Sequence, residues 1–142
     1  SLGERHGIGN VRFVEASIDD LPFDDASFDV VISNGVINLS PVKHLVFAEA
    51  ARVLRPDGRL AISDIVSSTP LKEATRRNTE LWAACIAGAI PTSAYLDELV
   101  AAGFAITAKR RNAYRFLSDR ARDASRTYGI ESTTIAATRE TS

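Results

Sequence analysis

The sequence predicts an α/β fold with a mostly parallel sheet, and two observations carry that prediction. Two runs rich in apolar and β-branched residues, 28–33 and 59–66, are typical of strands that are covered on both faces. Segments with the helical repeat of about 3.6 residues alternate with strand-like runs along the chain. The length of 142 residues, with 45% hydrophobic and 25% charged side chains, fits a single domain over residues 1–142.

The first part of the chain is expected to hold two strands. Residues 12–18 (RFVEASI) predict a short strand, and the polar residues 19–25 predict a loop at its carboxyl end. Residues 28–33 predict a central strand, because four of the six side chains in that run are apolar and three of these are β-branched.

A helix and a second buried strand are expected next. Ser40 is a candidate N-cap and Pro41 a candidate first helical residue, and apolar residues at helical spacing continue as far as residues 56–58. Gly58 supplies the backbone freedom that a tight turn needs. Residues 59–66 then predict the second strand.

The second half of the chain predicts further helices and strands by the same criteria. We expect helices at residues 73–89, 92–102 and 118–126, and strands at residues 104–111 and 133–138.

Composition and charge exclude several classes of function. Seventeen Lys and Arg against eighteen Asp and Glu give a net charge of −1, which supplies no field for nucleic acid or for an anionic membrane. No apolar run reaches the ~20 residues of a membrane span, and no signal peptide is evident, so we expect a cytoplasmic protein. Cys85 is the single cysteine, and only two histidines are present, so neither a disulfide nor a metal site is expected.

Three motifs, LPF (residues 21–23), SFDVV (residues 27–31) and RVLRPDGRL (residues 52–60), resemble class I S-adenosylmethionine-dependent methyltransferases. Two more segments, ISNGVINLSP (residues 32–41) and LWAACIAGA (residues 81–89), are similar to the arsenite methyltransferase branch of that family, where they read roughly ISNCVINLSP and LWxxCIxGA. The resemblance covers most of the chain.

The resemblance implies a seven-stranded Rossmann-like sheet in the order three-two-one-four-five-seven-six. In the family, a glycine-rich turn after strand one and an acid after strand two hold the cofactor, and the sequence shows neither. Its nearest candidate, residues 7–9 (GIG), precedes a predicted strand and opens no helix. The chain is therefore expected to be a partial methyltransferase domain that contains strands three to seven.

Loss of strands one and two would leave an open apolar edge along residues 28–33. Proteins avoid such edges by pairing or covering them. We expect either that residues 12–18 fold back into the vacancy, or that two chains pair across it as a homodimer.

The cofactor that the resemblance implies is S-adenosylmethionine (SAM), and the matching positions are Ser17, Ile18, Asp19, Asn34 and Gly35. Two interpretations of Asn34 stay open, a contact to the methionine part of the cofactor or a cap on a loop. Asp19 is likewise either a partner for the adenine amino group or a solvated carboxylate in a turn.

Asp64 and Cys85 are the candidate catalytic residues. Asp64 follows the second buried strand and either positions a substrate or caps the next loop. In the arsenite enzymes the thiolate matching Cys85 binds trivalent arsenic with a second cysteine, and Gly35 stands at that second position here. One thiolate holds a soft ion weakly, so a buried helical role for Cys85 is the alternative. His44 is expected on an exposed helix face.

These features predict the C-terminal part of a SAM-dependent, arsenite methyltransferase-like enzyme that acts on a small molecule and is inactive alone. The alternative is a non-catalytic binding or assembly module derived from the same fold. A nicotinamide-dependent oxidoreductase is disfavoured, because the sequence has neither a G-x-G-x-x-G turn nor a Tyr-x-x-x-Lys pair.

Overall fold

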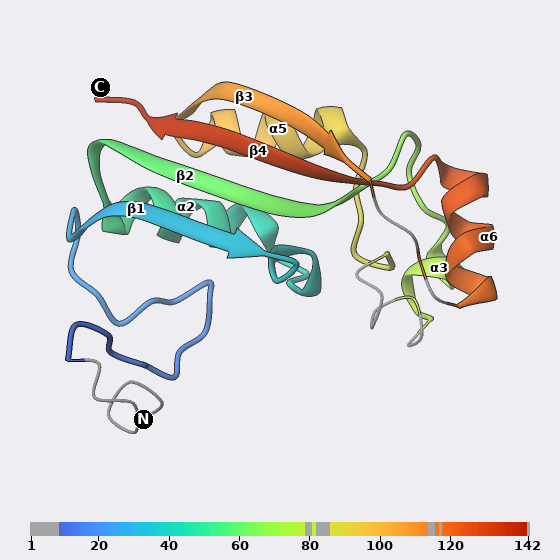
Figure 1. The fold of residues 1–142 in the computed structure, drawn as a ribbon, viewed down its shortest axis with the longest axis horizontal. Coiled ribbons are helices and arrows are strands. Elements are labelled where there is room, and N and C mark those ends of the chain that lie inside the picture. Colours follow the sequence, from blue (N-terminus) through green and yellow to red (C-terminus); the bar gives the residue numbers. More distant parts are fainter. Residues whose placement is uncertain (1–8, 79–80, 82–85, 114–115, 117, 142) are drawn as a thin grey trace.

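A computed structural model describes residues 9–78, 81, 86–113, 116 and 118–141. Four strands form one sheet: β1 (Phe28–Asn34), β2 (Leu54–Val66), β3 (Phe104–Asn112) and β4 (Glu131–Arg139). Their spatial order is β1-β2-β4-β3, which is the order four-five-seven-six that the resemblance implies. The expected fold class, a partial Rossmann-like sheet with flanking helices, is confirmed (Figure 1).

Three of the four strands, β1, β2 and β3, point the same way, as expected for a mostly parallel sheet, and β4 is reversed. β1 and β2 run parallel, whereas β4 runs antiparallel to both β2 and β3. Helix α6 (Asp119–Tyr128) joins β3 to β4, and it lies beyond the end of the sheet instead of crossing its face (Figure 1). A connection that does not cross back over the sheet returns the chain in the opposite direction.

Two helices, α2 (Lys43–Val53) and α5 (Thr92–Ala101), pack on one face of the sheet and enclose the main core (Figure 1). The rings of Phe47 in α2 and Tyr95 in α5 meet edge to face, with centroids 5.3 Å apart. Both side chains are fully buried, so this contact joins the two helices inside the core.

The start of α2 differs from the expectation, because the helix begins at Lys43 and not at Pro41. A short 3-10 helix, η1 (Ile37–Leu39), comes first, and the Ser40 hydroxyl accepts a 3.1 Å hydrogen bond from the Val42 N–H. Ser40 therefore stabilises the turn that precedes the helix, but the N-cap residue is Val42 and not Ser40.

The expected turn at residues 56–58 is a bulge inside β2. The pairing with β1 passes from Phe28–Leu54 directly to Val30–Arg59. Asp57 takes the positive φ of 65°, and Gly58 is required for a different reason. A Cβ at position 58 would lie 2.7 Å from the backbone oxygen of Arg55.

Residues 12–18 do not form the expected strand. They are mostly exposed and contain only an isolated bridge between Ser17 and Asp20. Strand formation needs a neighbouring strand to satisfy the backbone, and within the described residues none lies beside this segment. The expectation that residues 12–18 fold back to pair with the 28–33 strand is therefore wrong.

β1 is an edge strand and not the central strand suggested by its composition. Among the described residues it pairs only with β2, and Ile32 and Val30 keep 76% and 47% of their surface exposed. The expectation of an open apolar edge is confirmed.

The expected helix over residues 73–89 is described only as α3 (Glu73–Arg76), and part of that range lies outside the described residues. The helix expected at 92–102 and the one at 118–126 are confirmed as α5 and α6. A second, smaller apolar cluster, beyond the carboxyl end of β2, joins Ile65, Leu71, residues 86–89 and the buried face of α6.

Candidate functional site

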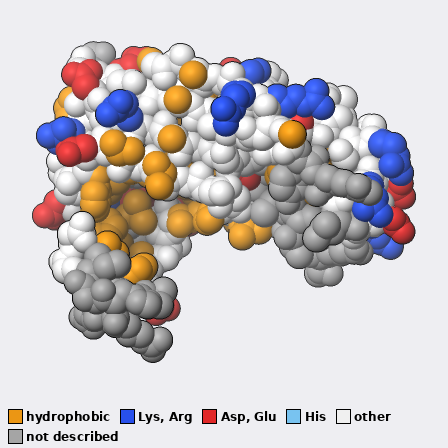
Figure 2. Space-filling view, viewed as in Figure 1, with side chains coloured by type: hydrophobic (Ala, Val, Ile, Leu, Met, Phe, Trp, Pro, Cys, Tyr) orange, Lys and Arg blue, Asp and Glu red, His pale blue; other side chains and the backbone are white. Residues whose placement is uncertain are grey.

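An apolar pocket of about 340 Å³ lies at the carboxyl end of β1. Its lining comes from the N-terminal loop (Ile18 and Leu21), from β1, and from α2 (Phe47 and Ala50). Val31 and Ile32 both line it although successive side chains of a strand point to opposite faces, so the pocket wraps around the outer edge of β1. Figure 2 shows hydrophobic side chains gathered in a hollow between this loop and the sheet.

Three of the predicted cofactor residues, Ser17, Ile18 and Asp19, lie in the N-terminal loop, and of these only Ile18 lines the pocket. Ile18 is half-buried and lines the pocket. The Ser17 hydroxyl donates to the Asp19 carboxylate, and the Asp20 N–H donates to the Ser17 carbonyl at 3.1 Å. Ser17 is exposed, and its hydroxyl is bound to Asp19 within the turn. This arrangement is compatible both with a carboxylate that serves the turn and with one that accepts from an adenine amino group.

Asn34 and Gly35 form the opposite rim at the end of β1. Asn34 lines the pocket with its side chain exposed. Gly35 has a φ of 73°, and its N–H donates to the Ser63 carbonyl at 2.8 Å. The positive φ alone favours glycine here, because a Cβ at this position would meet nothing within 4 Å.

Asp64 lies behind the pocket and does not line it. Its side chain is buried, and its two oxygens accept from the N–H groups of Ile65 at 2.9 Å and Asn38 at 3.2 Å. The Tyr95 hydroxyl donates to the same carboxylate at 3.3 Å. Burial raises the pKa of Asp64, and these three donors act against that shift.

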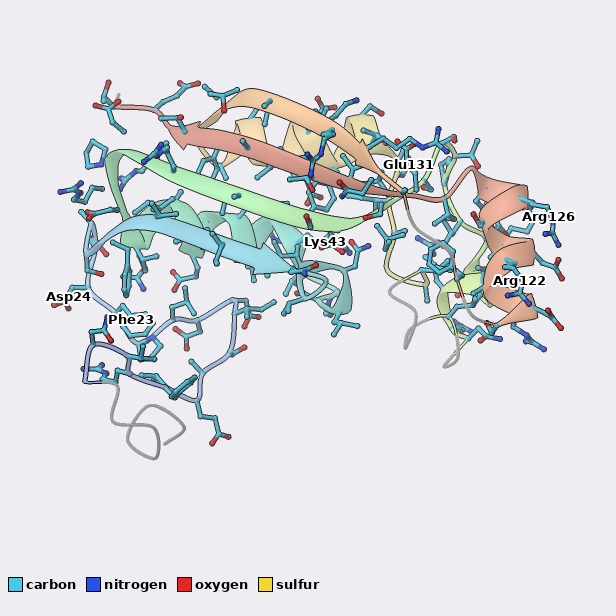
Figure 3. The ribbon with its side chains drawn as sticks, viewed as in Figure 1. Phe23, Asp24, Lys43, Arg122, Arg126 and Glu131 are labelled. Atoms are coloured by element: carbon cyan, nitrogen blue, oxygen red, sulfur yellow. The ribbon has the colours of Figure 1, made fainter. Side chains whose placement is uncertain are left out.

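Lys43 brings a cation to the same buried cluster, and Figure 3 shows it close to the carboxyl end of β1. Its ammonium donates to the Ser40 carbonyl at 3.3 Å. Burial lowers the pKa of Lys43, while the charges of Asp64 and Glu98 raise it. The cluster therefore connects β2 to the start of α2 and to η1.

Asn38 links this cluster to the pocket rim. Its backbone N–H reaches Asp64, and its side-chain amide donates to the Ile65 carbonyl. Because η1 directly follows the rim residues Asn34 and Gly35, these bonds fix where the rim lies. Asp64 thus contacts a residue that follows the rim, and it does not line the pocket itself.

Cys85 and His6 lie outside the described residues, and His44 is exposed as expected. Within the described ranges, no three His, Cys, Asp or Glu side chains are grouped so that they could hold a metal ion. The helices of the same ranges are all too short or too polar to span a bilayer.

Sequence reasoning did not identify the bond between Tyr95 and Asp64. It also missed Lys43, Asn38, and the pair Glu49 and Arg52 on α2, which bind the N-terminal loop. The only signals were a lysine inside an otherwise amphipathic helix and an acidic and a basic residue three positions apart. Neither pattern identifies a partner distant in sequence.

Comparison with protein families gives a match to the methyltransferase domain over residues 2–121. An arsenite methyltransferase from Halobacterium salinarum is 42% identical over 115 residues, which cover 78% of this chain and 29% of that protein. The human arsenite methyltransferase is 40% identical over 92 residues, covering 61% of this chain and 24% of that protein. The chain thus spans less than a third of the length of these relatives.

Solved structures share the fold. An arsenic(III) S-adenosylmethionine methyltransferase from Chlamydomonas reinhardtii superposes with a TM-score of 0.73 at 28% identity, over 97% of this chain and 48% of that one. A geranyl diphosphate methyltransferase solved in complex with SAM has a TM-score of 0.76 at 20% identity, over 97% of this chain and 62% of that one. The second likeness supports the fold alone.

Proposed function

The chain belongs to the methyltransferase domain family, and we propose from this that residues 1–142 form one side of a SAM-dependent methyltransferase site that acts on a small molecule. The observation that supports the proposal is the apolar pocket at the carboxyl end of β1, because ligands of open α/β sheets bind beyond the carboxyl ends of strands. The Chlamydomonas relative, an enzyme that uses SAM, covers nearly the whole chain.

The residues around the pocket fit part of SAM. The apolar side chains of Ile18 and Leu21 suit the face of an adenine ring, and Asp19 offers a carboxylate that can accept from its amino group. The Asn34 amide, on the opposite rim, can both donate to and accept from the amino acid end of the cofactor. SAM supplies an electrophilic methyl group on a sulfonium. The roles of Ser17, Ile18, Asp19, Asn34 and Gly35 are proposals on this basis.

We propose that this polypeptide alone binds SAM weakly and does not catalyse methyl transfer. The pocket volume of about 340 Å³ lies at the lower end of the ~300–1,000 Å³ range of small-molecule sites. The pocket is also open along the unpaired edge of β1. Orienting a methyl donor and its acceptor accounts for roughly 7–11 kcal/mol of a reaction barrier, and a site enclosed on one side does not provide that orientation.

Asp64 is proposed as a positioning residue for the rim, since the bond from Asn38 is its link to the pocket. The methyl acceptor is proposed to be a small molecule other than a tightly chelated arsenic ion. Gly35 offers no thiolate, and Cys85 is the one cysteine of these 142 residues. A soft trivalent ion needs more than one sulfur ligand for tight binding.

The two edges of the sheet suggest how the site is completed. Exposed Lys109, Arg110 and Arg111 follow one another on the β3 edge, a pattern that discourages strand pairing. The β1 edge instead exposes Val30 and Ile32. We propose that the β1 edge is paired in the working protein, and a homodimer across this edge is the arrangement to test by sedimentation.

The experiment for the proposed function is a calorimetric titration of SAM into the chain and into Asn34→Ala, with Asn112→Ala on the distant β3 edge as the control. We expect a Kd of about 1 mM for the unsubstituted chain and the Asn112 variant, and about fivefold to tenfold weaker binding for Asn34→Ala. Micromolar affinity would contradict the one-sided site. No binding at millimolar SAM would contradict the cofactor pocket itself.

A further inference from the structure

The loop wall of the pocket has little regular structure of its own. Residues 17–27 contain one isolated bridge, yet Ile18 and Leu21 from this segment form part of the pocket lining. An irregular segment keeps a fixed position only if other elements hold it. Two side chains of α2, those of Glu49 and Arg52, bind this segment and keep it in place.

Arg52 uses all five of its N–H donors, and three of them bind the loop. Nε and one Nη2 proton donate to Glu49, at 2.7 and 2.9 Å. The other Nη2 proton donates to the Leu21 carbonyl at 2.9 Å, and Nη1 donates to the Phe23 carbonyl at 2.7 Å and to Asp25 at 2.8 Å. A guanidinium has five N–H donors, and each has an acceptor here.

Glu49 completes the arrangement from the same helix face. One carboxylate oxygen accepts from the Leu21 N–H at 2.7 Å, so both backbone polar groups of Leu21 are bound to α2 side chains. The backbone carbonyls of Arg52 and Val53 accept from Ala26 and Ser27, each at 2.8 Å, which fixes the far end of the loop. Figure 3 shows Phe23 in this loop, beside β1.

Neither Glu49 nor Arg52 lines the pocket, whereas Ala50 between them does. We propose that Glu49 and Arg52 are positioning residues that set the width of the cofactor pocket by holding Leu21, and with it Ile18, at a fixed distance from α2. This inference rests on the proposed function for the identity of the ligand. The role is one of position, because both side chains contact the loop backbone and not the pocket interior.

The pair is expected to contribute little to global stability. The side chains of Arg52, Glu49 and Asp25 keep 32%, 17% and 80% of their surface exposed. Ion pairs at that exposure are screened by water and salt and add little to the free energy of unfolding. Local loop position and overall stability can therefore be separated by experiment.

The test uses Arg52→Lys and Glu49→Gln, with Arg55→Lys as the matched control. Arg55 is also on the surface and pairs with Asp29 at 2.7 Å, but it makes no contact to the loop wall. Lysine keeps the charge at position 52 but lacks the planar fork that binds two carbonyls and two carboxylates together. Amide exchange at Leu21, the methyl resonances of Ile18 and Leu21, the melting temperature and the Kd for SAM are measured for each variant.

We expect Arg52→Lys and Glu49→Gln to speed Leu21 exchange about tenfold and to shift both methyl resonances. The melting temperature should change little, and the Kd for SAM should rise about threefold to tenfold. The double variant should resemble either single variant, because the two residues act as one unit. Arg55→Lys should change none of these properties.

Unchanged Leu21 exchange and methyl resonances in both variants would overturn the inference. Faster exchange with an unchanged Kd would also overturn it, since the loop would then not set the pocket. If the unsubstituted chain does not bind SAM at all, the proposed function fails, while the ligand-free exchange and methyl measurements still decide whether the pair positions the wall.

Discussion

The Tyr95→Phe substitution probes the buried cluster behind the pocket. It removes the hydroxyl that donates to Asp64 at 3.3 Å and leaves the ring, so the edge-to-face contact with Phe47 and the packing volume are retained. A hydrogen bond to a charged group contributes about 1.5–3 kcal/mol, and one as long as this belongs to the lower part of that range. Asp64 also keeps its bonds from Ile65 and Asn38. We therefore expect a loss of about 1.5–2 kcal/mol once Asp64 is ionised.

The pH dependence follows from the raised pKa of Asp64. Because burial lifts this pKa above its ordinary value of 3.8, the folded protein keeps the Asp64 proton to a higher pH than the unfolded chain does. The contribution of Asp64 to the free energy of unfolding therefore falls as pH rises from the unfolded to the folded pKa. The Tyr95 hydroxyl opposes the shift, so its removal lifts the pKa further and enlarges the loss. With Asp64 protonated, the missing bond is neutral and is worth about 0.5–1 kcal/mol.

The assay is urea unfolding followed by circular dichroism, at about pH 4 and about pH 8. The matched control is Tyr128→Phe, which removes a hydroxyl 3.0 Å from that of Thr75, a neutral partner. The cost of Tyr95→Phe should grow by about 1 kcal/mol between the two pH values, whereas the cost of Tyr128→Phe should not change. Equal, pH-independent costs for the two variants would refute the ionic character of the cluster.

Three further substitutions test other parts of the structure. Gly58→Ala should destabilise the fold by about 1–3 kcal/mol, because a Cβ there meets backbone at 2.7 Å, while Gly9→Ala, with open space around it, should have little effect in the same unfolding assay. Ser118→Ala should cost about 1 kcal/mol, because its side chain accepts from the backbone at the start of α6. Ile32→Lys should abolish any dimer in sedimentation without lowering the melting temperature, and Val100→Lys, which changes another exposed apolar side chain on α5, should leave the dimer intact. A dimer that survives Ile32→Lys would exclude the β1 edge as its interface.

Local patterns predicted most of the elements. The runs rich in apolar residues at 28–33 and 59–66 lie in β1 and β2, because β-branched side chains fit a packed sheet wherever that sheet lies. The same runs did not show that β1 is at the edge. An apolar composition indicates that a strand can be buried, but it does not indicate which strands lie beside it. The strand prediction for residues 12–18 was wrong for the same reason, because no strand lies beside them within the described residues.

The candidate site was predicted only in part. The carboxyl end of β1, with Asn34 and Gly35, followed from the general position of sites in α/β sheets. The Asp64–Tyr95 bond joins residues 31 positions apart, and the Arg52–Leu21 bond joins residues 31 apart as well. Such contacts depend on how helices dock on the sheet, and no short sequence pattern encodes that docking.

The most direct test of the central claim is an NMR titration of the isotope-labelled chain with millimolar SAM, read residue by residue. The account predicts weak binding with shifts concentrated at residues 17–21 and 34–37, the two walls of the pocket at the end of β1. It would be contradicted by shifts that gather elsewhere, for example around Thr75 and Tyr128 beyond the carboxyl end of β2, or by the absence of shifts in both walls.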